Sequence, residues 1–239
     1  MNIGLSSNVF DLDELRNRSH VFRDRIHAGE ILAGMLERYR ASDALVLGIP
    51  AGGIPIATTI ARQLELSLDV AVVSKITLPW NTEAGYGAVA FDGTVRLNKR
   101  LLSQLGLSEQ EIQQGITKTL DKVRRRVERL RGGRAFPSLT QRRVILVDDG
   151  LASGFTLRTA EEALFKAGAD RLIVAVPTAH QTSLQAVADE VEALYCPNIR
   201  QGWSFAVADA YQYWADIGEE EVIAELKPFI LQFTAADQS

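Results

Sequence analysis

The chain has 239 residues, of which 46% are hydrophobic and 23% are charged, and its formal net charge is −4. This length allows one α/β domain with an appendage but not two domains of common size, and the negative charge argues against a protein built to coat nucleic acid or an anionic membrane. Cys196 is the single cysteine, which excludes an intrachain disulfide, and neither a signal-peptide pattern nor an apolar stretch of membrane-spanning length is seen, so we expect a cytoplasmic protein.

The first predicted elements surround a loop with two adjacent glycines. Apolar residues recur at helical spacing over residues 28–39, which predicts an amphipathic helix. Residues 44–49 are typical of a buried strand, and residues 54–64 follow as a helix with Pro55 in its first turn, where proline is tolerated. The glycines of the loop 50–53 allow the backbone to approach a ligand closely. A tight strand-to-helix turn without a ligand explains the same residues.

The next segment combines a predicted strand with a predicted loop. Residues 69–74 form a third strand that ends at Lys75, which either pairs with nearby charged groups or remains an exposed surface lysine. Residues 76–87 mix proline, glycine, aromatic and polar residues, which predicts a long mobile loop. Short strands are expected at residues 88–91 and 94–97.

Two helices are predicted between residues 98 and 131. Asn98 caps a first helix, and Ser108 with Glu111 forms a capping box for a second helix over residues 109–131. An apolar stripe on the second helix suits either the core or a partner. Its other faces are basic, which fits either a solvated surface or an anion or RNA surface. The basic residues are Lys118, Lys122, Arg124, Arg125, Arg126, Arg129 and Arg131.

The most informative stretch joins an apolar strand at residues 144–147 to a helix at residues 157–167. Asp148 and Asp149 end the strand, and the loop 150–156 contains two glycines and two hydroxyl side chains. Such a loop directs backbone N–H groups and the helix dipole at one point, which suits a phosphate, while adjacent carboxylates suit a sugar diol or a hydrated divalent cation. A ribose 5-phosphate satisfies both. The alternative is a strand that ends in an acidic turn.

The pattern of strand and helix then continues. Residues 171–177 form a further buried strand, residues 181–188 a helix and residues 191–195 a last strand, which completes a parallel core of five strands. His180 follows the strand 171–177 at the sheet edge where ligands collect, so it either contacts a ligand or caps the next helix. Beyond it, residues 196–218 are rich in aromatics and residues 219–233 predict a helix. The aromatics are Trp203, Phe205, Tyr211, Tyr213 and Trp214.

The apolar run, the two aspartates, the Gly/Ser/Thr loop and Thr156 at the helix start resemble the phosphoribosyl-diphosphate (PRPP) motif of type I phosphoribosyltransferases. Other stretches are similar to a bacterial group of predicted phosphoribosyltransferases, namely residues 22–25, 48–53, 74–76, 87–90 and 207–216. The resemblance implies an α/β fold with an open parallel β-sheet core flanked by helices. It also implies one domain over residues 1–239, with a core at about 28–195 and a small hood built from the N-terminal segment and residues 196–218.

The resemblance further implies a PRPP site with Mg²⁺. Asp148 and Asp149 hold the ribose hydroxyls, directly or through magnesium, and with Lys75 form the catalytic set. His180 is a candidate contact for the acceptor. The residues implied for the 5-phosphate are Gly150, Leu151, Ala152, Ser153, Gly154, Phe155 and Thr156, and those implied for pyrophosphate are Pro50, Ala51, Gly52, Gly53 and Lys75.

Three features depart from the pattern of that family. Phe155 stands where a small residue is usual, and it would crowd the phosphate if its ring pointed inward. Ala51 stands where the most similar members carry arginine, which removes a cation from a polyanion site. The expected flap at residues 76–87 carries no basic residue before Arg96, although many flaps of the family do.

The sequence therefore predicts a PRPP-dependent phosphoribosyltransferase that acts on a small nitrogenous acceptor, such as a nucleobase, and forms a homodimer. The alternative is a PRPP-sensing or nucleotide-sensing regulator that binds RNA or a protein, which the loss of cations at the pyrophosphate site favours. A phosphohydrolase with Asp148 as nucleophile ranks third, because that chemistry usually uses an Asp-x-Asp order that this chain lacks.

Overall fold

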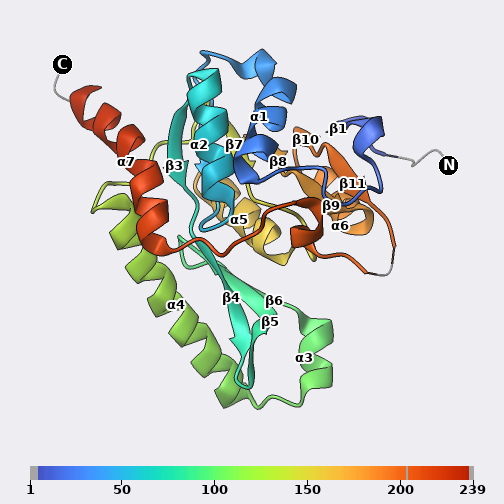
Figure 1. Cartoon of the computed structure of the whole chain (residues 1–239). Coiled ribbons are helices and arrows are strands. Elements are labelled where there is room, and N and C mark those ends of the chain that lie inside the picture. Colours follow the sequence, from blue (N-terminus) through green and yellow to red (C-terminus); the bar gives the residue numbers. More distant parts are fainter. Residues whose placement is uncertain (1–4, 203, 237–239) are drawn as a thin grey trace.

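The computed structural model describes residues 5–202 and 204–236 of the chain. At its centre is a six-stranded sheet in the order β1-β10-β8-β7-β2-β3, in which every neighbouring pair is parallel (Figure 1). The predicted open parallel sheet is confirmed, and a two-residue edge strand joins the five expected ones. The strands are β1 (Val9–Phe10), β2 (Leu45–Gly48), β3 (Ser67–Val70), β7 (Arg143–Val147), β8 (Arg171–Ala175) and β10 (Ala193–Tyr195).

Helices cover both faces of this sheet. Along β7, Ile145 and Val147 pack in one apolar core with residues of α1, α2 and α7, whereas Val144 and Leu146 pack in a second core with residues of α5 and α6. Burial on both faces explains why the central strands are continuous apolar runs. The helices are α1 (Arg25–Met35), α2 (Gly53–Leu64), α5 (Phe155–Lys166), α6 (Gln181–Ala188) and α7 (Glu219–Ala236).

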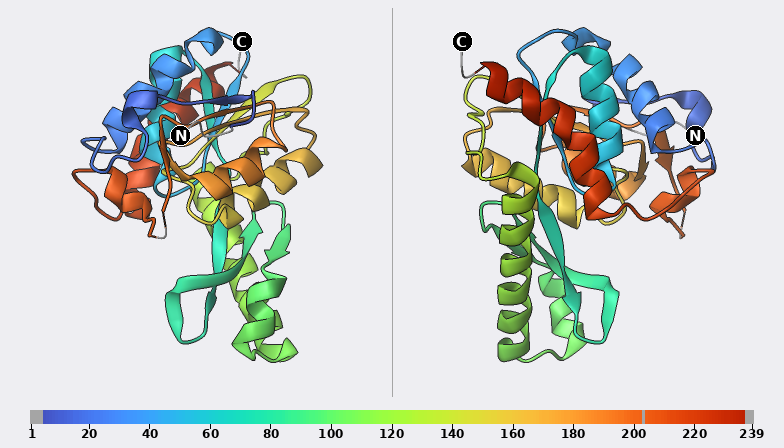
Figure 2. Two further views of the ribbon diagram at one scale, coloured as in Figure 1. Left: turned by 90° about the vertical axis from the view of Figure 1, so that its right-hand side faces the viewer. Right: turned by 60° about the vertical axis from the view of Figure 1, so that its left-hand side comes forward.

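A smaller unit projects from one end of the core (Figures 1 and 2). In it, α4 runs beside an antiparallel sheet, and its stripe of Ile112, Ile116 and Leu120 packs into the same apolar core as β4 and β5. A Cβ on Gly115 would lie 2.0 Å from the Tyr86 hydroxyl, so the helix packs closely on β5. The stripe therefore belongs to the core of the chain. The elements are β4 (Val73–Leu78), β5 (Asn81–Ala90), β6 (Val95–Leu97), α3 (Lys99–Leu105) and α4 (Glu109–Arg131).

Two sequence predictions are wrong in this unit. Residues 76–87 are not a long loop, because β4 and β5 pair through most of them as an antiparallel hairpin. Gly87 is typical of a loop in the sequence, but a Cβ there would lie 2.6 Å from the backbone oxygen of Arg96, so glycine lets β5 and β6 approach closely. Residues 69–74 are not one strand either. They include the end of β3 and the start of β4, which lie in different sheets although the apolar run continues through both.

Segments from both ends of the sequence pack together beside the central sheet. Phe22 forms a parallel bridge with Tyr211, and the amide of Asn17 donates to the backbone oxygen of Ile199 over 3.0 Å. Trp203 lies outside the described residues. The remaining elements are the short helices η1 (Asp13–Leu15), η2 (Glu37–Tyr39) and η3 (Val207–Ala210) and the paired strands β9 (Thr178–His180) and β11 (Asn198–Arg200).

Among the described helices, none combines the length and the apolar character needed to cross a lipid bilayer.

Candidate functional site

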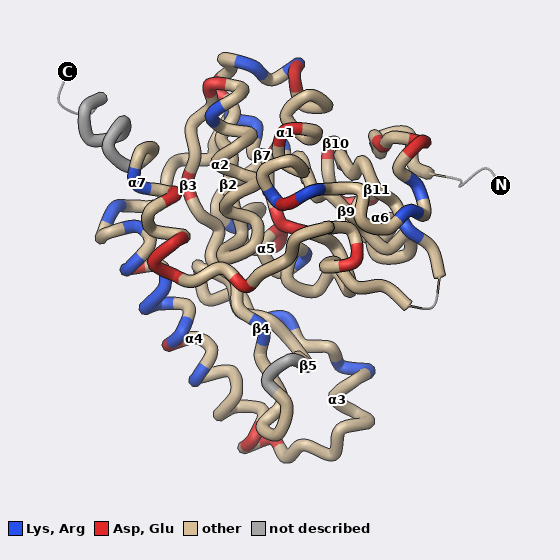
Figure 3. Tube along the Cα trace, viewed as in Figure 1, with Lys and Arg blue, Asp and Glu red and all other residues tan. Residues whose placement is uncertain are grey.

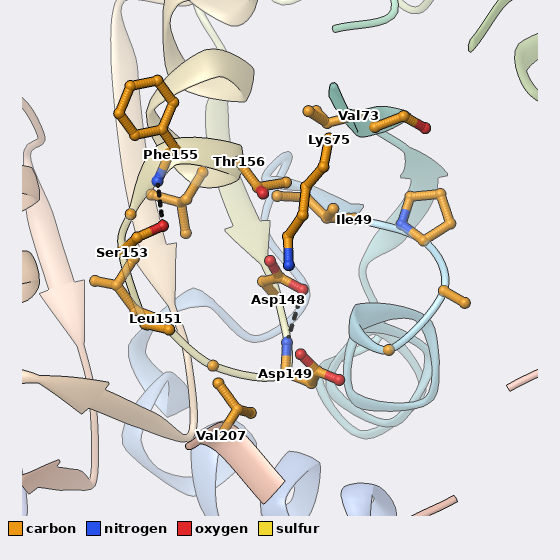
Figure 4. Close-up of a pocket in the computed structure, with 18 of the residues that line it drawn as sticks. Ile49, Val73, Lys75, Asp148, Asp149, Leu151, Ser153, Phe155, Thr156 and Val207 are labelled. Atoms are coloured by element: carbon orange, nitrogen blue, oxygen red, sulfur yellow. Dashed lines mark hydrogen bonds between the residues drawn. The ribbon is translucent and has the colours of Figure 1, made fainter. Parts of the chain in front are cut away.

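A cavity of about 390 Å³ lies at the carboxyl ends of β2 and β7 (Figure 4). The loop from β7 to α5 forms one wall, and the loop from β2 to α2 forms another. Strand β4, helix α4 and Val207 of η3 complete the lining. Parallel sheets collect ligands at this edge, because their strand-to-helix loops all open there.

The structure brings most of the predicted site residues together in this cavity. Residues 148–156, Lys75 and the loop residues 50–52 all line it. Gly53 packs below it instead, where a Cβ would lie 2.6 Å from the backbone oxygen of Val147. His180 does not line the cavity: its Nε2 atom lies 3.0 Å from the backbone oxygen of Gly202, and its ring meets Phe205 edge-on.

The loop after β7 is fixed by its neighbours. The amide of Leu151 donates to the backbone oxygen of Thr178 over 2.8 Å, and the amide of His180 donates to the backbone oxygen of Leu151 over 3.0 Å. The Leu151 amide is therefore used by the fold, although the sequence placed this residue among the phosphate ligands. Gly150 lies against Val207, because a Cβ at Gly150 would be 2.5 Å from that side chain.

The end of this loop can bind an anion through its backbone. Gly154 adopts a φ of 75°, and α5 begins at Phe155, so the first amides of the helix have no partner within the helix. The hydroxyl of Ser153 lies 3.5 Å from the amide of Phe155, and Thr156 also lines the cavity. Figure 4 shows the Phe155 ring directed away from Asp148 and Asp149, so the aromatic substitution leaves the centre of the cavity open.

The loop after β2 approaches the aspartates closely. Its Pro50–Ala51 peptide bond is cis. A Cβ on Gly52 would lie 1.8 Å from Oδ2 of Asp149, so the position accepts only a glycine while that carboxylate stays in place. The two loops are thus packed on each other, and the requirement for glycine at position 52 comes from close approach.

Asp149 is held by residues that the sequence did not assign to the site. Arg25 donates to Oδ2 of Asp149 from Nη2 over 3.0 Å and from Nε over 3.1 Å. The Arg25 guanidinium lies 3.8 Å from the centre of the Trp214 ring, which is a cation–π contact. Tyr211 donates its hydroxyl to the backbone oxygen of Asp149 over 2.7 Å. Arg25 and Asp149 are 124 residues apart, so sequence spacing gives no signal of this ion pair.

The electrostatics of the aspartate pair favour a bound cation. Burial raises the pKa of Asp148 well above its usual range, and the neighbouring Asp149 raises it further, while Lys75 and Arg25 act in the opposite direction. Burial also raises the pKa of Asp149, against the effect of Arg25. Figure 4 shows the Lys75 side chain extending toward Asp148. A cation that binds both carboxylates would favour their ionised forms.

Asp148 and Asp149 are the carboxylates of this cavity that could hold a divalent cation. Within residues 5–202 and 204–236, no group of three or more His, Cys, Asp or Glu side chains is arranged to hold a metal ion. Asp148 and Asp149 supply two adjacent carboxylates, and Mg²⁺ typically combines one or two carboxylates with water and substrate phosphates. The residues present therefore fit Mg²⁺ that enters with a phosphorylated ligand.

The sequence also missed two cations on α4. Lys122 and Arg126 line the same cavity as the aspartates, one helical turn apart. The sequence identified both as part of a basic helix surface, but their position over the cavity depends on how the projecting unit meets the core.

Comparisons with known proteins find relatives over most of the chain. A model of the phosphoribosyl transferase domain matches residues 23–210. Proteins from two strains of Mycobacterium tuberculosis, each named provisionally as a phosphoribosyl transferase, are 35% identical over 209 residues, which is 86% of this chain and 46% of theirs. The chain thus spans about half the length of these curated relatives. The crystal structure of the protein TT1426 from Thermus thermophilus is 32% identical with a TM-score of 0.69, over 87% of this chain and 98% of that one.

Proposed function

Because this chain belongs to the phosphoribosyltransferase family, we propose that it transfers the phosphoribosyl group of PRPP to a nitrogenous acceptor and releases pyrophosphate. One observation carries the proposal: paired carboxylates, the amide-rich start of α5 and residues 50–52 of the glycine loop converge on one cavity. These three groups suit, in that order, a sugar diol, its 5-phosphate and a pyrophosphate.

The start of α5 holds the 5-phosphate in this proposal. The backbone amides of residues 152–156 and the hydroxyls of Ser153 and Thr156 are the donors. The positive end of the helix dipole adds to the attraction for the phosphate. Leu151 contributes through packing, because its amide already donates to Thr178.

The two aspartates hold the ribose and stabilise the transition state of the transfer. Asp148 and Asp149 accept hydrogen bonds from the ribose hydroxyls or bind Mg²⁺, and that ion, when bound, offsets the charge of the departing pyrophosphate. In the transfer, the bond from the anomeric carbon to the pyrophosphate oxygen breaks and its electron pair leaves with pyrophosphate. A bond to the acceptor nitrogen forms, and the acceptor's N–H proton passes to water. Nearby carboxylates stabilise the positive charge that develops on the sugar.

The loop 50–53 and Lys75 hold the pyrophosphate. Pro50, Ala51 and Gly52 line the cavity, and Gly52 lies close to Asp149 because it carries no Cβ. The amide of Gly53 donates to the backbone oxygen of Ile49 over 3.0 Å, so the amides of Ala51 and Gly52 are the donors in this proposal. Lys75 extends into the cavity from β4 and adds a positive charge (Figure 4).

The test is pyrophosphate release from PRPP and Mg²⁺ across a panel of purine, pyrimidine and other nitrogenous acceptors. We expect release that depends on one class of acceptor and that is lost in Asp148→Asn/Asp149→Asn. Release at the same rate with every acceptor, or unchanged release in that variant, would contradict the proposal.

A second candidate is a regulator that binds PRPP without transferring it. Two observations favour it: position 51 carries a methyl group instead of a cation, and Asp149 already pairs with Arg25. Tight PRPP binding without release for any acceptor would favour the regulator over the enzyme.

A further inference from the structure

A second cavity adjoins the pyrophosphate side of the first. It measures about 600 Å³ and lies between α4 and the segment that leads into α7. Ala51, Lys122 and Arg126 line both cavities, so the two spaces meet at these three residues. Arg125 and Arg129 extend the basic wall of the second cavity.

The loop 50–53 itself offers a pyrophosphate no positive side chain. Pyrophosphate carries several negative charges, and backbone amides are neutral donors that bind it less strongly than a charged group would. Position 51 carries only a methyl group, and the cations that line both cavities, Lys122 and Arg126, belong to α4.

Lys122 and Arg126 differ in exposure and in their ion-pair partners. Lys122 is exposed, and within the described part of the chain no acidic partner lies within ion-pair distance of it. The Arg126 side chain is only 18% exposed and pairs with Glu219 at the start of α7 over 3.2 Å. Figure 3 shows the basic residues along α4 beside the acidic start of α7.

We propose that Lys122 and Arg126 of α4 bind the pyrophosphate end of the substrate and replace the cation that the 50–53 loop lacks. The identity of the anion rests on the proposed function. Glu219 is then a competitor for Arg126: in the free protein it holds the guanidinium, and a bound pyrophosphate takes its place.

Calorimetric titration with inorganic pyrophosphate and Mg²⁺ tests this assignment. We expect Lys122→Ala to weaken binding about tenfold, because one charge-assisted contact is lost. The matched control is Arg124→Ala on the same helix. Arg124 is 74% exposed, pairs with Asp121 over 3.7 Å and lines neither cavity, so we expect its variant to bind within about twofold of the parent chain.

Two further variants separate a local charge effect from a structural one. Ala51→Arg in the Lys122→Ala background should recover most of the lost affinity, because it returns a cation to the same point. Glu219→Gln should tighten pyrophosphate binding severalfold, because it frees Arg126 and also Arg129, which pairs with the same carboxylate over 2.7 Å. Equal affinities for Lys122→Ala and Arg124→Ala would overturn the role of Lys122, and an unchanged affinity in Glu219→Gln would overturn that of Arg126.

The outcomes distinguish this inference from the proposed function. Pyrophosphate can bind without any transfer reaction. If Lys122→Ala weakens pyrophosphate binding but no acceptor causes pyrophosphate release from PRPP, only the proposed function is overturned. Release that depends on the acceptor, with pyrophosphate affinity equal in Lys122→Ala and Arg124→Ala, overturns only the inference. A single-stranded RNA that binds more tightly than pyrophosphate, and is weakened equally by both substitutions, would make α4 a general polyanion surface and also overturn it.

Discussion

The two strand-to-helix loops of the cavity differ in what they present to a ligand. The loop after β7 presents two carboxylates and two hydroxyls, whereas the loop after β2 lines the cavity with Pro50, Ala51 and Gly52. The first can recognise a sugar diol through side chains. The second can only offer amides, and charge must reach it from Lys75 or α4. In the proposed function, sugar recognition is therefore local in the sequence, while pyrophosphate recognition is assembled from distant elements.

The largest expected effect comes from the loop after β7. In Asp148→Asn/Asp149→Asn, we expect about a hundredfold loss of PRPP affinity, because two charge-assisted contacts to the sugar or its metal disappear. Affinity for pyrophosphate without Mg²⁺ should not fall, since the other loop binds it. Calorimetry with PRPP and with pyrophosphate measures both affinities. Equal losses of affinity for the two ligands would show that the two loops do not bind separate parts of PRPP.

The next largest effect is expected from a substitution at the contact between the two loops. In Gly52→Ala the new Cβ would lie 1.8 Å from Oδ2 of Asp149, so either the loop or the carboxylate must move. We expect about a tenfold loss of PRPP affinity, in line with the cost of overpacking at a tight contact. Gly34→Ala is the control, because nothing lies within 4 Å of a Cβ there. Full affinity in Gly52→Ala would contradict the close packing of the loops.

The next prediction concerns a buried glutamate on α5, the helix that follows the β7 loop. Glu161 is fully buried, neither of its oxygens has a hydrogen-bond partner among the described residues, and burial together with Glu190 raises its pKa to about 8, against Arg158 and Arg96. Since the folded state holds this proton more tightly than the unfolded state, the group's contribution to stability falls as the pH rises toward 8.

Glu161→Gln should remove that loss. We expect the free energy of unfolding of the variant, relative to the parent chain, to rise by about 3 kcal/mol between pH 5 and pH 8. Urea denaturation at the two pH values measures it, and parallel pH profiles of the two proteins would refute the prediction.

The smallest expected effect concerns the ion pair between Arg25 and Asp149. Arg25 lowers the pKa of Asp149, so Arg25→Ala should raise that pKa further and move the acid limb of PRPP binding to higher pH. We expect a severalfold loss of affinity at pH 6 and a smaller loss at pH 8. Arg25→Lys keeps the charge and serves as the control. Titrations at both pH values test this, and a loss independent of pH would assign Arg25 a purely structural role.

The sequence predicted the parts of the molecule that depend on neighbouring residues. The strand at residues 144–147 and the loop 148–156 that follows it are contiguous, so the strand and the polar groups that line the cavity are visible in the sequence without the fold. The parallel sheet was likewise predicted, because strands buried on both faces are apolar throughout.

Contacts across long sequence separations could not be predicted in the same way. Arg25 reaches Asp149 across 124 residues, and Lys122 and Arg126 reach the cavity only because α4 packs on β4 and β5. The hairpin at residues 76–87 was missed for another reason. Its glycines allow close approach of strands, and the same residue type also marks flexible loops.

In the proposed function, one cavity binds the sugar, the 5-phosphate and the pyrophosphate of PRPP together. Calorimetric titration with PRPP, with ribose 5-phosphate and with pyrophosphate, each with Mg²⁺, tests it most directly. We expect PRPP to bind more tightly than either fragment, with each fragment displaced by PRPP in competition. Equal affinities for PRPP and one fragment, or no binding of PRPP, would contradict the account.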